Sequence, residues 1–480
     1  MTPLRLATVL LAAVLLAPAA RADSRALPPD VEAALAAAGV PREAISVLVQ
    51  DIAPLPRSRL AWNADRAMNP ASVTKLLTTY AALELLGPAY TWTTGVWLQG
   101  KVEAGVLDGN LVIKGSGDPK LVLERIWLLL RRVQALGVRE IRGDIVLDRS
   151  AFPAPERDPG EFDGEPLRPH NAQADALLLN FKAITLGFTP DPARGVALVS
   201  IDPPLAGVRV DTSVPLTPLT CDDWRAGLKA DFGDPLQLRL TGSYPNACGE
   251  KQWLVAYADP RSYAARALAG MWKELGGTLG GTVHDGLAPP GRSLLEIASP
   301  ALADVVRDIN KFSNNVMAQQ LFLTLGLAQR GSGTPEAARE VLRRWIAMRL
   351  GRPPRDLVID NGSGLSRETR FSASFIAKLL QTAWTGPVMP ELVSSLSLAG
   401  IDGTLRRVKG LTGRAHLKTG SLRDVAAVAG YVLSTSGRRY VMVAMINHPN
   451  ANEARPALDA LIQWVSNDGN EPPLRSELQN

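Results

Sequence analysis

The sequence contains few of the residues that hold metals or build disulfide frameworks, with two cysteines and four histidines in 480 residues. The histidines are scattered along the chain, at His170, His284, His416 and His448. No spacing among these residues matches a zinc site, which needs a close group of Cys, His or acidic ligands. We therefore expect neither a metal nor a cofactor.

The sequence also lacks a block of basic residues. Lys and Arg number 52 against 47 Asp and Glu, and the excess of +5 is spread along the chain. A nucleic-acid partner is therefore not expected. With 46% hydrophobic and 21% charged residues, the composition is that of a globular protein. A chain of this length usually forms two or three domains, because single cores stop growing near ~250–300 residues.

Beyond the N-terminus, no segment is long and apolar enough to cross a membrane. At the N-terminus itself, Arg5 precedes an apolar run from Leu6 to Leu16, and Ala20-Arg21-Ala22 forms a cleavage site of small residues. The run is shorter than the ~20 residues of a membrane span, and Pro18 disfavours a retained anchor. Residues 1–22 are therefore predicted to be a signal peptide. The mature chain is expected to be exported and periplasmic, without a transmembrane anchor.

The two cysteines, Cys221 and Cys248, are an even pair in a chain that is expected to fold in an oxidising compartment. Two free thiols remain an alternative, but we favour a disulfide. Closing that loop is worth about 3.5 kcal/mol in the chain-entropy model.

Hydrophobic patterning predicts an α+β domain built from both ends of the chain. Near the N-terminus we expect a helix at 30–38, strands at 45–52 and 58–63, and a helix that runs to Leu86. Near the C-terminus we expect strands at 415–422, 426–434 and 439–447, and a helix at 453–465. Helices at both ends can cover one antiparallel sheet, which is how an α+β layer forms.

The middle of the chain has a different character. Residues 93–258 contain short β-rich segments, many Gly and Pro turns and one helical patch at 121–136. We therefore predict an inserted β-rich region at 93–258, made of two small domains. The α+β domain would then be discontinuous, from 23–92 and 259–480.

Three short motifs carry the candidate chemistry. Ser72-Val73-Thr74-Lys75 is an S-x-x-K, Ser313-Asn314-Asn315 is an S-x-N, and Lys418-Thr419-Gly420-Ser421 is a K-T-G-S. Each motif alone has an ordinary structural explanation: a helix cap with a solvated lysine, a polar helix start, or a strand with a glycine bulge. The ordered set of three makes those explanations jointly improbable.

The S-x-x-K motif places a nucleophile beside a base. Positions three apart share one face of a helix, so the side chains of Ser72 and Lys75 can meet. A serine hydroxyl needs an adjacent base to take its proton. A lysine can be that base only if burial or a neighbouring cation lowers its pKa, and Lys418 is a candidate for that cation.

The other two motifs supply groups that bind substrate. Ser313 can relay a proton between Lys75 and the leaving nitrogen, and the Asn315 amide can hold a substrate amide. Gly420 removes a side chain where a substrate strand must approach. Lys418 and Thr419 can bind a carboxylate, and the N–H groups of Ser72 and Ser421 can form an oxyanion hole.

These motifs, in this order, resemble those of the serine penicillin-recognising enzymes, which comprise penicillin-binding proteins and serine β-lactamases. The long distance from Ser72 to Ser313 is similar to that of the D-alanyl-D-alanine carboxypeptidase/endopeptidase family. These are class C low-molecular-mass penicillin-binding proteins with a large insertion between the first two motifs. Further segments resemble that family over nearly the whole mature chain: residues 70–75, 115–119, 143–148, 361–367 and 399–404.

The resemblance implies a transpeptidase-like fold and a role for each motif residue. Ser72 would be the acylated nucleophile, Lys75 its general base and Ser313 a proton shuttle. Asn315 would bind the substrate amide. Lys418 and Thr419 would bind the terminal carboxylate, beside Gly420, and the Ser421 N–H would lie in the oxyanion hole. Asp148, in the insertion, and Arg367 would lie near the substrate side chain.

The function that follows is hydrolysis of D-alanyl bonds in peptidoglycan stem peptides through a Ser72 acyl-enzyme, with β-lactams as covalent inhibitors. The substrate bond would be the terminal D-Ala, the cross-link, or both. A serine β-lactamase is the main alternative. No E-x-x-L-N element lies between Ser313 and Lys418, and the second motif is S-N-N rather than Y-x-N, so the known water-activating groups are missing. A catalytically silent wall-binding protein is disfavoured because every motif residue is present.

Overall fold

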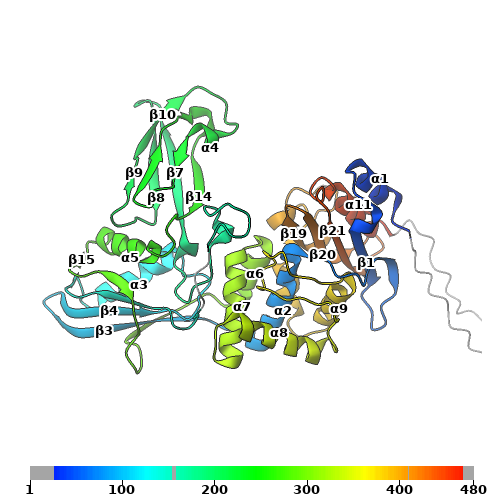
Figure 1. The fold of residues 1–480 in the computed structure, drawn as a ribbon, viewed down its shortest axis with the longest axis horizontal. Helices are drawn as coiled ribbons and strands as arrows, with labels where there is room; N and C mark the ends of the chain where they lie inside the picture. Colours follow the sequence, from blue (N-terminus) through cyan, green and yellow to red (C-terminus); the bar gives the residue numbers. More distant parts are fainter. Residues whose placement is uncertain (1–25, 154–157, 409, 469–480) are drawn as a thin grey trace, which may run out of the picture.

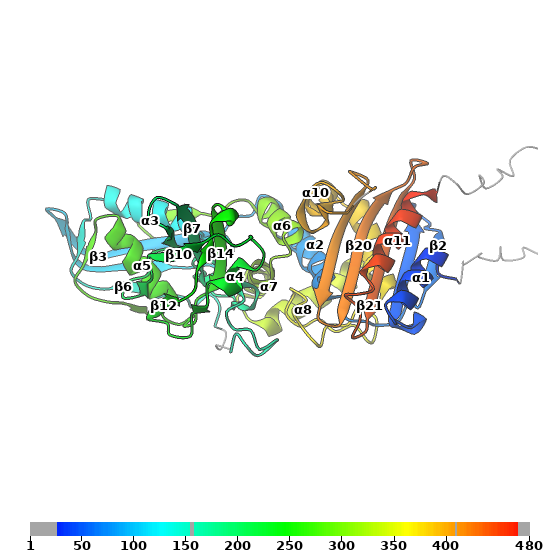
Figure 2. The same cartoon turned by 90° about the horizontal axis from the view of Figure 1, so that it is seen from above.

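The computed structural model describes residues 26–153, 158–408 and 410–468. The predicted signal peptide at residues 1–22 lies outside them. The molecule is elongated, with two bodies placed end to end (Figures 1 and 2). The body at the right of Figure 1 comes from both ends of the chain, and the other comes from its middle. Among the described residues, no helix combines the length and the apolarity that crossing a membrane requires.

A six-stranded antiparallel sheet joins the two ends of the chain in the first body, which we call the terminal domain. Its strand order is β18-β19-β20-β21-β1-β2. The bounds are β1 Ile45–Asp51, β2 Ser58–Trp62, β18 Ser397–Leu398, β19 Ala415–Leu422, β20 Val425–Leu433 and β21 Arg439–Asn447. Strand β1 pairs with β21 along its whole length, from Ile45 opposite Ile446 to Asp51 opposite Tyr440. The predicted α+β domain from both chain ends is confirmed.

Helices cover both faces of this sheet. One face packs against α1 Pro29–Ala37 and α11 Arg455–Ser466. The other face packs against a helical cluster: α2 Lys75–Leu86, α6 Leu302–Lys311, α7 Asn315–Arg330, α8 Pro335–Arg349, α9 Ala373–Trp384 and α10 Met389–Ser395. Strands β20 and β21 are therefore buried along almost their whole length. Burial on both faces explains why they read as continuous apolar runs rather than as alternating ones.

The base of the second body is a seven-stranded sheet. Its main path runs β15-β5-β4-β3-β17, with β6 between β4 and β16. The bounds are β3 Thr93–Glu103, β4 Val106–Lys114, β5 Glu140–Ile141, β6 Ile145–Asp148, β15 Thr278–Leu279, β16 Val283–Asp285 and β17 Leu295–Ala298. Helices α3 Leu123–Ala135 and α5 Tyr263–Glu274 share its core.

The insertion extends further along the chain than the sequence indicated. Strand β17 pairs with β3, so that Ala298 lies opposite Thr93 and the two ends of the insertion meet. The predicted end at residue 258 is therefore too early, and the insertion spans about 93–298. The amphipathic helix α5 caused this error. Its pattern resembles that of the helices that follow, but its apolar face, including Trp272, packs in the core of the insertion.

An upper lobe, residues 183–256, rises from this base in Figure 1. It contains a five-stranded sheet in the order β13-β10-β8-β7-β14 and a small sheet in the order β11-β12-β9. The bounds are β7 Ala183–Asp191, β8 Val196–Asp202, β9 Arg209–Val210, β10 Ser213–Thr217, α4 Trp224–Gly227, β11 Ala230–Asp231, β12 Gln237–Leu240, β13 Tyr244–Pro245 and β14 Lys251–Ala256. The lobe holds the Cys221–Cys248 disulfide, as predicted. Base and lobe share one hydrophobic core.

Candidate active site

Ser72 lies on a single 3₁₀ turn, Ala71–Thr74, that leads directly into α2. Neither this turn nor α2 is capped by a side-chain hydrogen bond, so Ser72 does not serve as a helix cap. Its hydroxyl instead meets the amine of Lys75, with 2.9 Å between Oγ and Nζ. The preceding residue, Ala71, has a φ of 46°. A left-handed alanine is costly and persists only where its surroundings impose it, as at many active sites.

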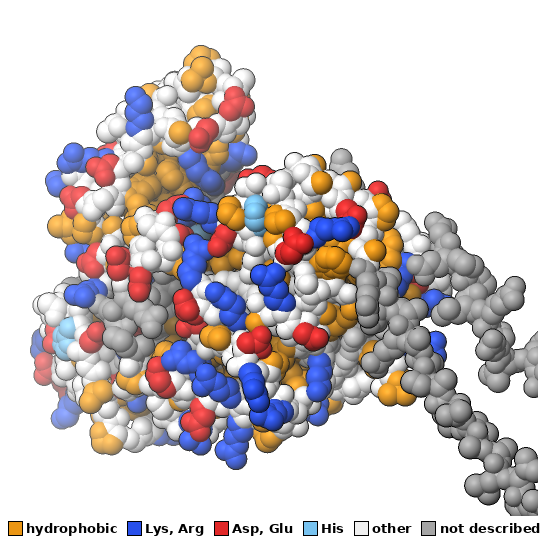
Figure 3. All heavy atoms as spheres, turned by 45° about the vertical axis from the view of Figure 1, so that its right-hand side comes forward, with side chains coloured by type: hydrophobic (Ala, Val, Ile, Leu, Met, Phe, Trp, Pro, Cys, Tyr) orange, Lys and Arg blue, Asp and Glu red, His pale blue; other side chains and the backbone are white. Residues whose placement is uncertain are grey.

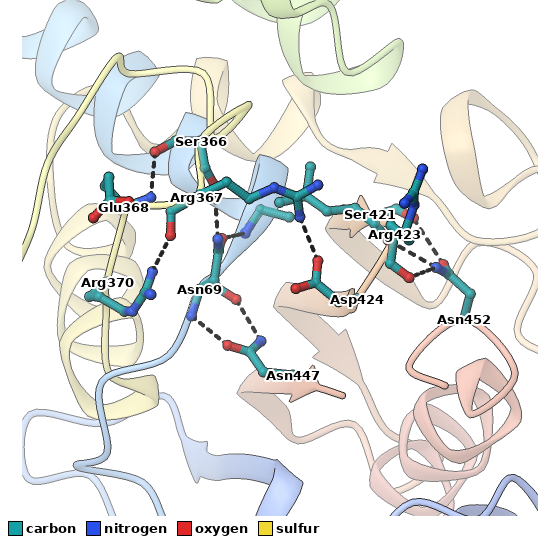
Figure 4. A network of polar contacts seen from close by, with 12 residues as sticks. Asn69, Ser366, Arg367, Glu368, Arg370, Ser421, Arg423, Asp424, Asn447 and Asn452 are labelled. Atoms are coloured by element: carbon teal, nitrogen blue, oxygen red, sulfur yellow. Dashed lines mark hydrogen bonds and ion pairs between the residues drawn. The ribbon is translucent and has the colours of Figure 1, made fainter. Parts of the chain in front are cut away.

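Asn69 holds this turn in place (Figure 4). Its Oδ1 accepts a hydrogen bond from the Ala71 N–H at 2.9 Å, and its Nδ2 donates to the Ser366 carbonyl at 2.8 Å. Its backbone exchanges two hydrogen bonds with the side chain of Asn447, at 2.8 and 2.9 Å. The turn that carries Ser72 is thus tied to the end of β21 and to the segment after α8.

Lys75 is fully buried, and its amine contacts three oxygen atoms. Its Nζ lies 2.6 Å from Asn315 Oδ1, 2.6 Å from the Ser363 carbonyl and 2.9 Å from Ser72 Oγ. Burial, and secondarily the positive charge of Lys418, lower the pKa of Lys75 well below its usual value. A neutral amine has two N–H donors and one lone pair. The two carbonyl oxygens can only accept, so the lone pair faces the one partner that can donate, the Ser72 hydroxyl.

Lys418 is the second buried amine of the site. Its Nζ donates to Ser313 Oγ at 2.8 Å and to the Thr419 carbonyl at 2.7 Å. Burial lowers the pKa of Lys418 to about 7. The structure therefore forms two adjacent units, one of Ser72, Lys75 and Asn315 and one of Ser313, Lys418 and Thr419.

The S-x-N segment links the helical cluster to the sheet. Ser313 has a φ of 56°, and the next residue, Asn314, caps α7 by accepting from the Met317 N–H. On its other side, Lys311 is buried and pairs with Asp402 at 2.5 Å. This pair explains the segment at 399–404, which braces the loop that carries Ser313.

The free edge of β19 faces the site. Strand β18 pairs only with His416 and Leu417, so the edge from residue 418 onward has no neighbouring strand. The Ala415 carbonyl points toward this edge, because it accepts from the Ala399 N–H. Since backbone groups alternate along a strand, the N–H and C=O of Thr419 and Ser421 also point there. The Ser421 N–H is thus directed as an oxyanion-hole donor requires.

The reason for Gly420 differs from the one that we expected. A β-carbon at this position would lie 2.5 Å from the Pro70 carbonyl oxygen, 3.1 Å from Ala71 Cβ and 3.1 Å from the Ser72 nitrogen. The group that needs this space is the serine turn itself rather than an incoming substrate strand. Gly420 therefore allows β19 to pack directly against the nucleophile.

A groove of about 1320 Å³ passes over these residues. Ser72, Ser313, Asn315, Thr419, Gly420 and Ser421 all contribute to its walls. Arg367 also lines it, with its guanidinium 2.7 Å from Asp424 and 4.8 Å from the centre of the Phe162 ring, and its place near the substrate side chain stays a prediction.

Asp148 does not reach this groove. It ends strand β6 within the base, where it is 1% exposed and accepts from the N–H groups of Ser150 and Ala288. Its charge is paired with Lys114 at 3.2 Å. The predicted contact between Asp148 and the substrate side chain is therefore not supported by its position.

Acidic and aromatic groups from a later part of the insertion occupy that place. Phe162, Asp163, Glu165 and His170 line the groove opposite the terminal domain. Asp163 is fixed by His170 Nε2 at 3.2 Å and by Asn171 Nδ2 at 2.7 Å. Sequence reasoning missed this segment, although Phe162-Asp163 is an aromatic–acidic pair within a run of Gly and Pro. The hydrogen bond from Lys75 to the Ser363 carbonyl could not be predicted either, because every residue has a backbone carbonyl and no side-chain pattern marks this one.

The two sides of the groove differ in charge. The insertion contributes the carboxylates of Asp163 and Glu165, and the terminal domain contributes one carboxylate, Asp459, and five guanidinium groups: Arg367, Arg406, Arg407, Arg423 and Arg455. Arg455 donates to Ser421 Oγ at 2.6 Å. In Figure 3, side chains of both charges gather in the hollow between the upper lobe and the rest of the molecule. Among the described residues, no group of three or more His, Cys, Asp or Glu is placed to hold a metal ion.

Comparison with known proteins agrees with this geometry. Residues 27–468 match the model of the D-Ala-D-Ala carboxypeptidase 3 (S13) family. The chain belongs to that family. As an S13 member it is a serine peptidase of D-alanyl bonds, and the family resemblance read from its motifs is confirmed.

Two curated relatives match most of the chain. A D-alanyl-D-alanine carboxypeptidase of Actinomadura sp. (strain R39) is 27% identical over 96% of this chain and 88% of its own length. The D-alanyl-D-alanine carboxypeptidase DacB of Haemophilus influenzae is 25% identical over 85% of this chain and 87% of its own length.

Solved structures share the fold. Penicillin-binding protein 4 (dacB) from Haemophilus influenzae superposes with a TM-score of 0.69, at 22% identity, over 87% of this chain and 96% of that one. A peptidoglycan endopeptidase from Bdellovibrio bacteriovorus gives a TM-score of 0.51, at 16% identity, over 89% and 93%. The transpeptidase-like fold with a large insertion is thus confirmed.

Proposed function

We propose that the chain is an exported, periplasmic peptidase in which Ser72 is the acylated residue, acting as a D-Ala-D-Ala carboxypeptidase, a cross-link endopeptidase or both. The observation that carries this proposal is the contact between Ser72 Oγ and Lys75 Nζ at 2.9 Å, in a site that buries the amine. Its relatives support it, since they are named as D-alanyl-D-alanine carboxypeptidases. One solved neighbour is described as a penicillin G acylated endopeptidase.

Acylation begins when Ser72 Oγ attacks the carbonyl carbon of the penultimate D-Ala. The Oγ–C bond forms while the hydroxyl proton passes to the lone pair of Lys75. The carbonyl oxygen becomes an oxyanion, and the N–H groups of Ser72 and Ser421 stabilise it. Burial and the nearby charge of Lys418 lower the pKa of Lys75, so its amine is neutral before the reaction. A neutral amine can accept the proton directly, whereas an exposed, protonated lysine would first have to lose one.

Collapse of the oxyanion breaks the C–N bond and releases the terminal residue. The leaving nitrogen needs a proton, and the Ser313 hydroxyl supplies it. Ser313 Oγ is then reprotonated by Lys418 Nζ, from which it already accepts a hydrogen bond at 2.8 Å. The motifs alone suggest a relay from Lys75, but the hydrogen bond between Lys418 and Ser313 favours Lys418 as the immediate source of the proton.

The charges of the groove orient the substrate. The terminal carboxylate binds beside Lys418, Thr419 and Ser421, on the side where the arginines of the terminal domain lie. The amine of a diamino-acid side chain extends to the opposite wall, toward Asp163 and Glu165. A stem peptide with both charges is thus held at its terminal carboxylate and at its side-chain amine. When the substrate is a cross-link, the second stem peptide leaves along the side of the groove where the arginines lie.

Fluorescent penicillin labelling of the purified protein tests the assignment. The wild type is expected to form one covalent adduct per chain, and Ser72→Ala none. Ser374→Ala is a suitable control, because Ser374 lies on α9 away from the groove lining. Full labelling of Ser72→Ala would show that another residue is acylated.

A further inference from the structure

A second cavity of about 920 Å³ lies beside the active-site groove, and we call it the side slot. One wall is the segment Glu165–His170. The other wall belongs to the upper lobe and includes residues 252–255 of strand β14, Arg225 and Phe232. Glu165 and His170 line both cavities, so the segment that carries them lies between the side slot and the active-site groove.

The partition between the two cavities is fixed. Asp163 accepts hydrogen bonds from Asn171 Nδ2 and from the Glu165 N–H, and Asn171 Nδ2 also donates to the Glu165 carbonyl. His170 Nε2 lies 3.2 Å from Asp163. A ligand that extends past this segment therefore meets a fixed wall rather than a loose loop.

The lobe wall offers an aromatic surface with polar groups around it. Trp253 packs edge-on against Trp224 and Phe232, with ring centroids 6.1 and 5.3 Å apart. The Arg225 guanidinium lies 5.1 Å from the centre of the Trp224 ring and 5.8 Å from that of Trp253. Arg225 forms no ion pair among the described residues. Aromatic carbon beside a guanidinium and a side-chain amide suits a ligand with apolar C–H faces and many polar substituents.

The exposed edge of β14 adds backbone groups to this wall. Strand β14 is an edge strand, paired with β7 alone. The Ala256 N–H points away from β7, because it donates to the Leu167 carbonyl at 3.0 Å. By alternation, the N–H and C=O of Leu254 and Gln252 also point outward, into the side slot. Neither has a hydrogen-bond partner there among the described residues, and Leu254 is 50% exposed.

We propose that the side slot binds the glycan chain of peptidoglycan, a polymer of N-acetylated amino sugars. This inference rests on the proposed function, since the stem peptide in the active-site groove is attached to such a chain. A stem peptide of four or five residues spans roughly 15 Å when extended, so the glycan chain attached to a peptide in the groove can reach the neighbouring side slot. Sugar C–H faces pack on Trp253, and N-acetyl amides pair with the edge of β14 and with Arg225.

The test measures binding of glycan strands from which the stem peptides have been removed, by calorimetry with the full-length Ser72→Ala protein. Arg225→Ala combined with Leu254→Asp is expected to weaken binding at least about tenfold, because the double variant removes the guanidinium and places a carboxylate beside the aromatic surface. If the double variant unfolds at a lower temperature than the wild type, Arg225→Ala alone is measured instead, because Arg225 is exposed. The matched control is Arg209→Ala with Leu219→Asp, two exposed positions of the same lobe outside the side slot.

Two results for the Arg225→Ala, Leu254→Asp variant would overturn the inference. The first is unchanged affinity for the glycan, and the second is weaker binding of a sugar-free stem peptide with unchanged binding of the glycan. The second result would indicate strand addition of a peptide to β14. Glycan strands stripped of their acetyl groups are expected to bind more weakly. Penicillin acylation of the same variants, with Ser72 restored, is a separate readout. If acylation fails in every protein while glycan binding persists, the proposed function is wrong and the side slot still stands.

Discussion

Gly420 and Ser72 lie so close together that a β-carbon on Gly420 would be 3.1 Å from the Ser72 nitrogen. The K-T-G motif thus contributes more than a lysine and a threonine that face the substrate. It brings the strand of Ser421, the proposed oxyanion donor, into contact with the turn of Ser72, the proposed nucleophile. The distance between attacking oxygen and oxyanion hole is set by this contact.

Gly420→Ala is therefore expected to impair acylation by displacing Ser72. Loss of one aligned oxyanion donor costs about 10²–10³ in rate in other acyl-transfer enzymes, and we expect a loss of that order in the penicillin acylation rate. Gly227→Ala is the control, since a β-carbon there has no atom nearer than 3.5 Å. A Gly420→Ala protein that acylates at the wild-type rate would contradict this account of the contact.

The pH dependence of acylation reports on Lys75. The base must be neutral to accept a proton, so the acylation rate at saturating penicillin is expected to rise with pH through the lowered pKa of Lys75. Replacing Lys418 with methionine removes the neighbouring charge that helps to lower this pKa. The rising limb of the stopped-flow pH profile is then expected to move to higher pH. A limb that stays in place or moves to lower pH would show that Lys418 does not act on Lys75.

Lys418 itself limits substrate binding at higher pH. Its pKa of about 7 means that its positive charge is present below pH 7 and is lost above it. The KM for a peptide with a free terminal carboxylate is therefore expected to increase as pH rises above 7. A peptide whose terminal carboxylate is amidated serves as the control, and its weaker binding is expected to change little over the same range.

The two aspartates of the insertion are expected to separate stability from specificity. Asp148→Asn removes a buried, hydrogen-bonded carboxylate, so we expect a loss of stability of about 1–3 kcal/mol with an unchanged KM. Asp163→Asn is expected to raise the KM for a stem peptide with a free side-chain amine. The same peptide with that amine acetylated is the control. Its KM is expected to stay the same if Asp163 contacts the charge, and to rise as well if the substitution displaces the segment around Asp163.

The disulfide is expected to support the upper lobe without affecting the chemistry. Cys221 and Cys248 both lie within the lobe, distant from the groove lining. Cys221→Ala with Cys248→Ala is expected to lower the stability of the lobe by at most about 3.5 kcal/mol, measured by thermal unfolding. Penicillin acylation by this variant should match the wild type. Peptide mapping without reductant that found two free thiols would refute the bridge.

Much of the terminal domain could be predicted from the sequence because its signals are local. Strands β19 and β21 were predicted with their observed bounds, and β21 is defined by a continuous apolar run between turns. The contact of Ser72 with Lys75 follows from their spacing of three residues. The sequence also indicated that Lys418 lies near this pair, although Lys418 is far from both residues along the chain.

The features that were missed depend on which side of an element faces which neighbour. Helix α5 has the periodicity of the terminal-domain helices, and only tertiary packing places it in the insertion. Asp148 ends a strand in a family-like segment, but its carboxylate turns to the backbone of Ala288 rather than to the groove. The Ser363 carbonyl, which orients Lys75, leaves no trace in a side-chain pattern.

The most direct test of the account follows the fate of the acyl group on Ser72. Between Ser313 and Lys418 the sequence contains no E-x-x-L-N element, and its second motif is S-N-N rather than Y-x-N, so the known groups that activate water for β-lactam deacylation are missing. A burst-and-chase experiment with labelled penicillin, run beside D-Ala release from a pentapeptide with a diamino-acid side chain, measures both reactions. We predict a stoichiometric, long-lived penicilloyl adduct on Ser72 together with continuous release of D-Ala. Rapid multiple turnover of the β-lactam without D-Ala release would identify a β-lactamase and contradict the account.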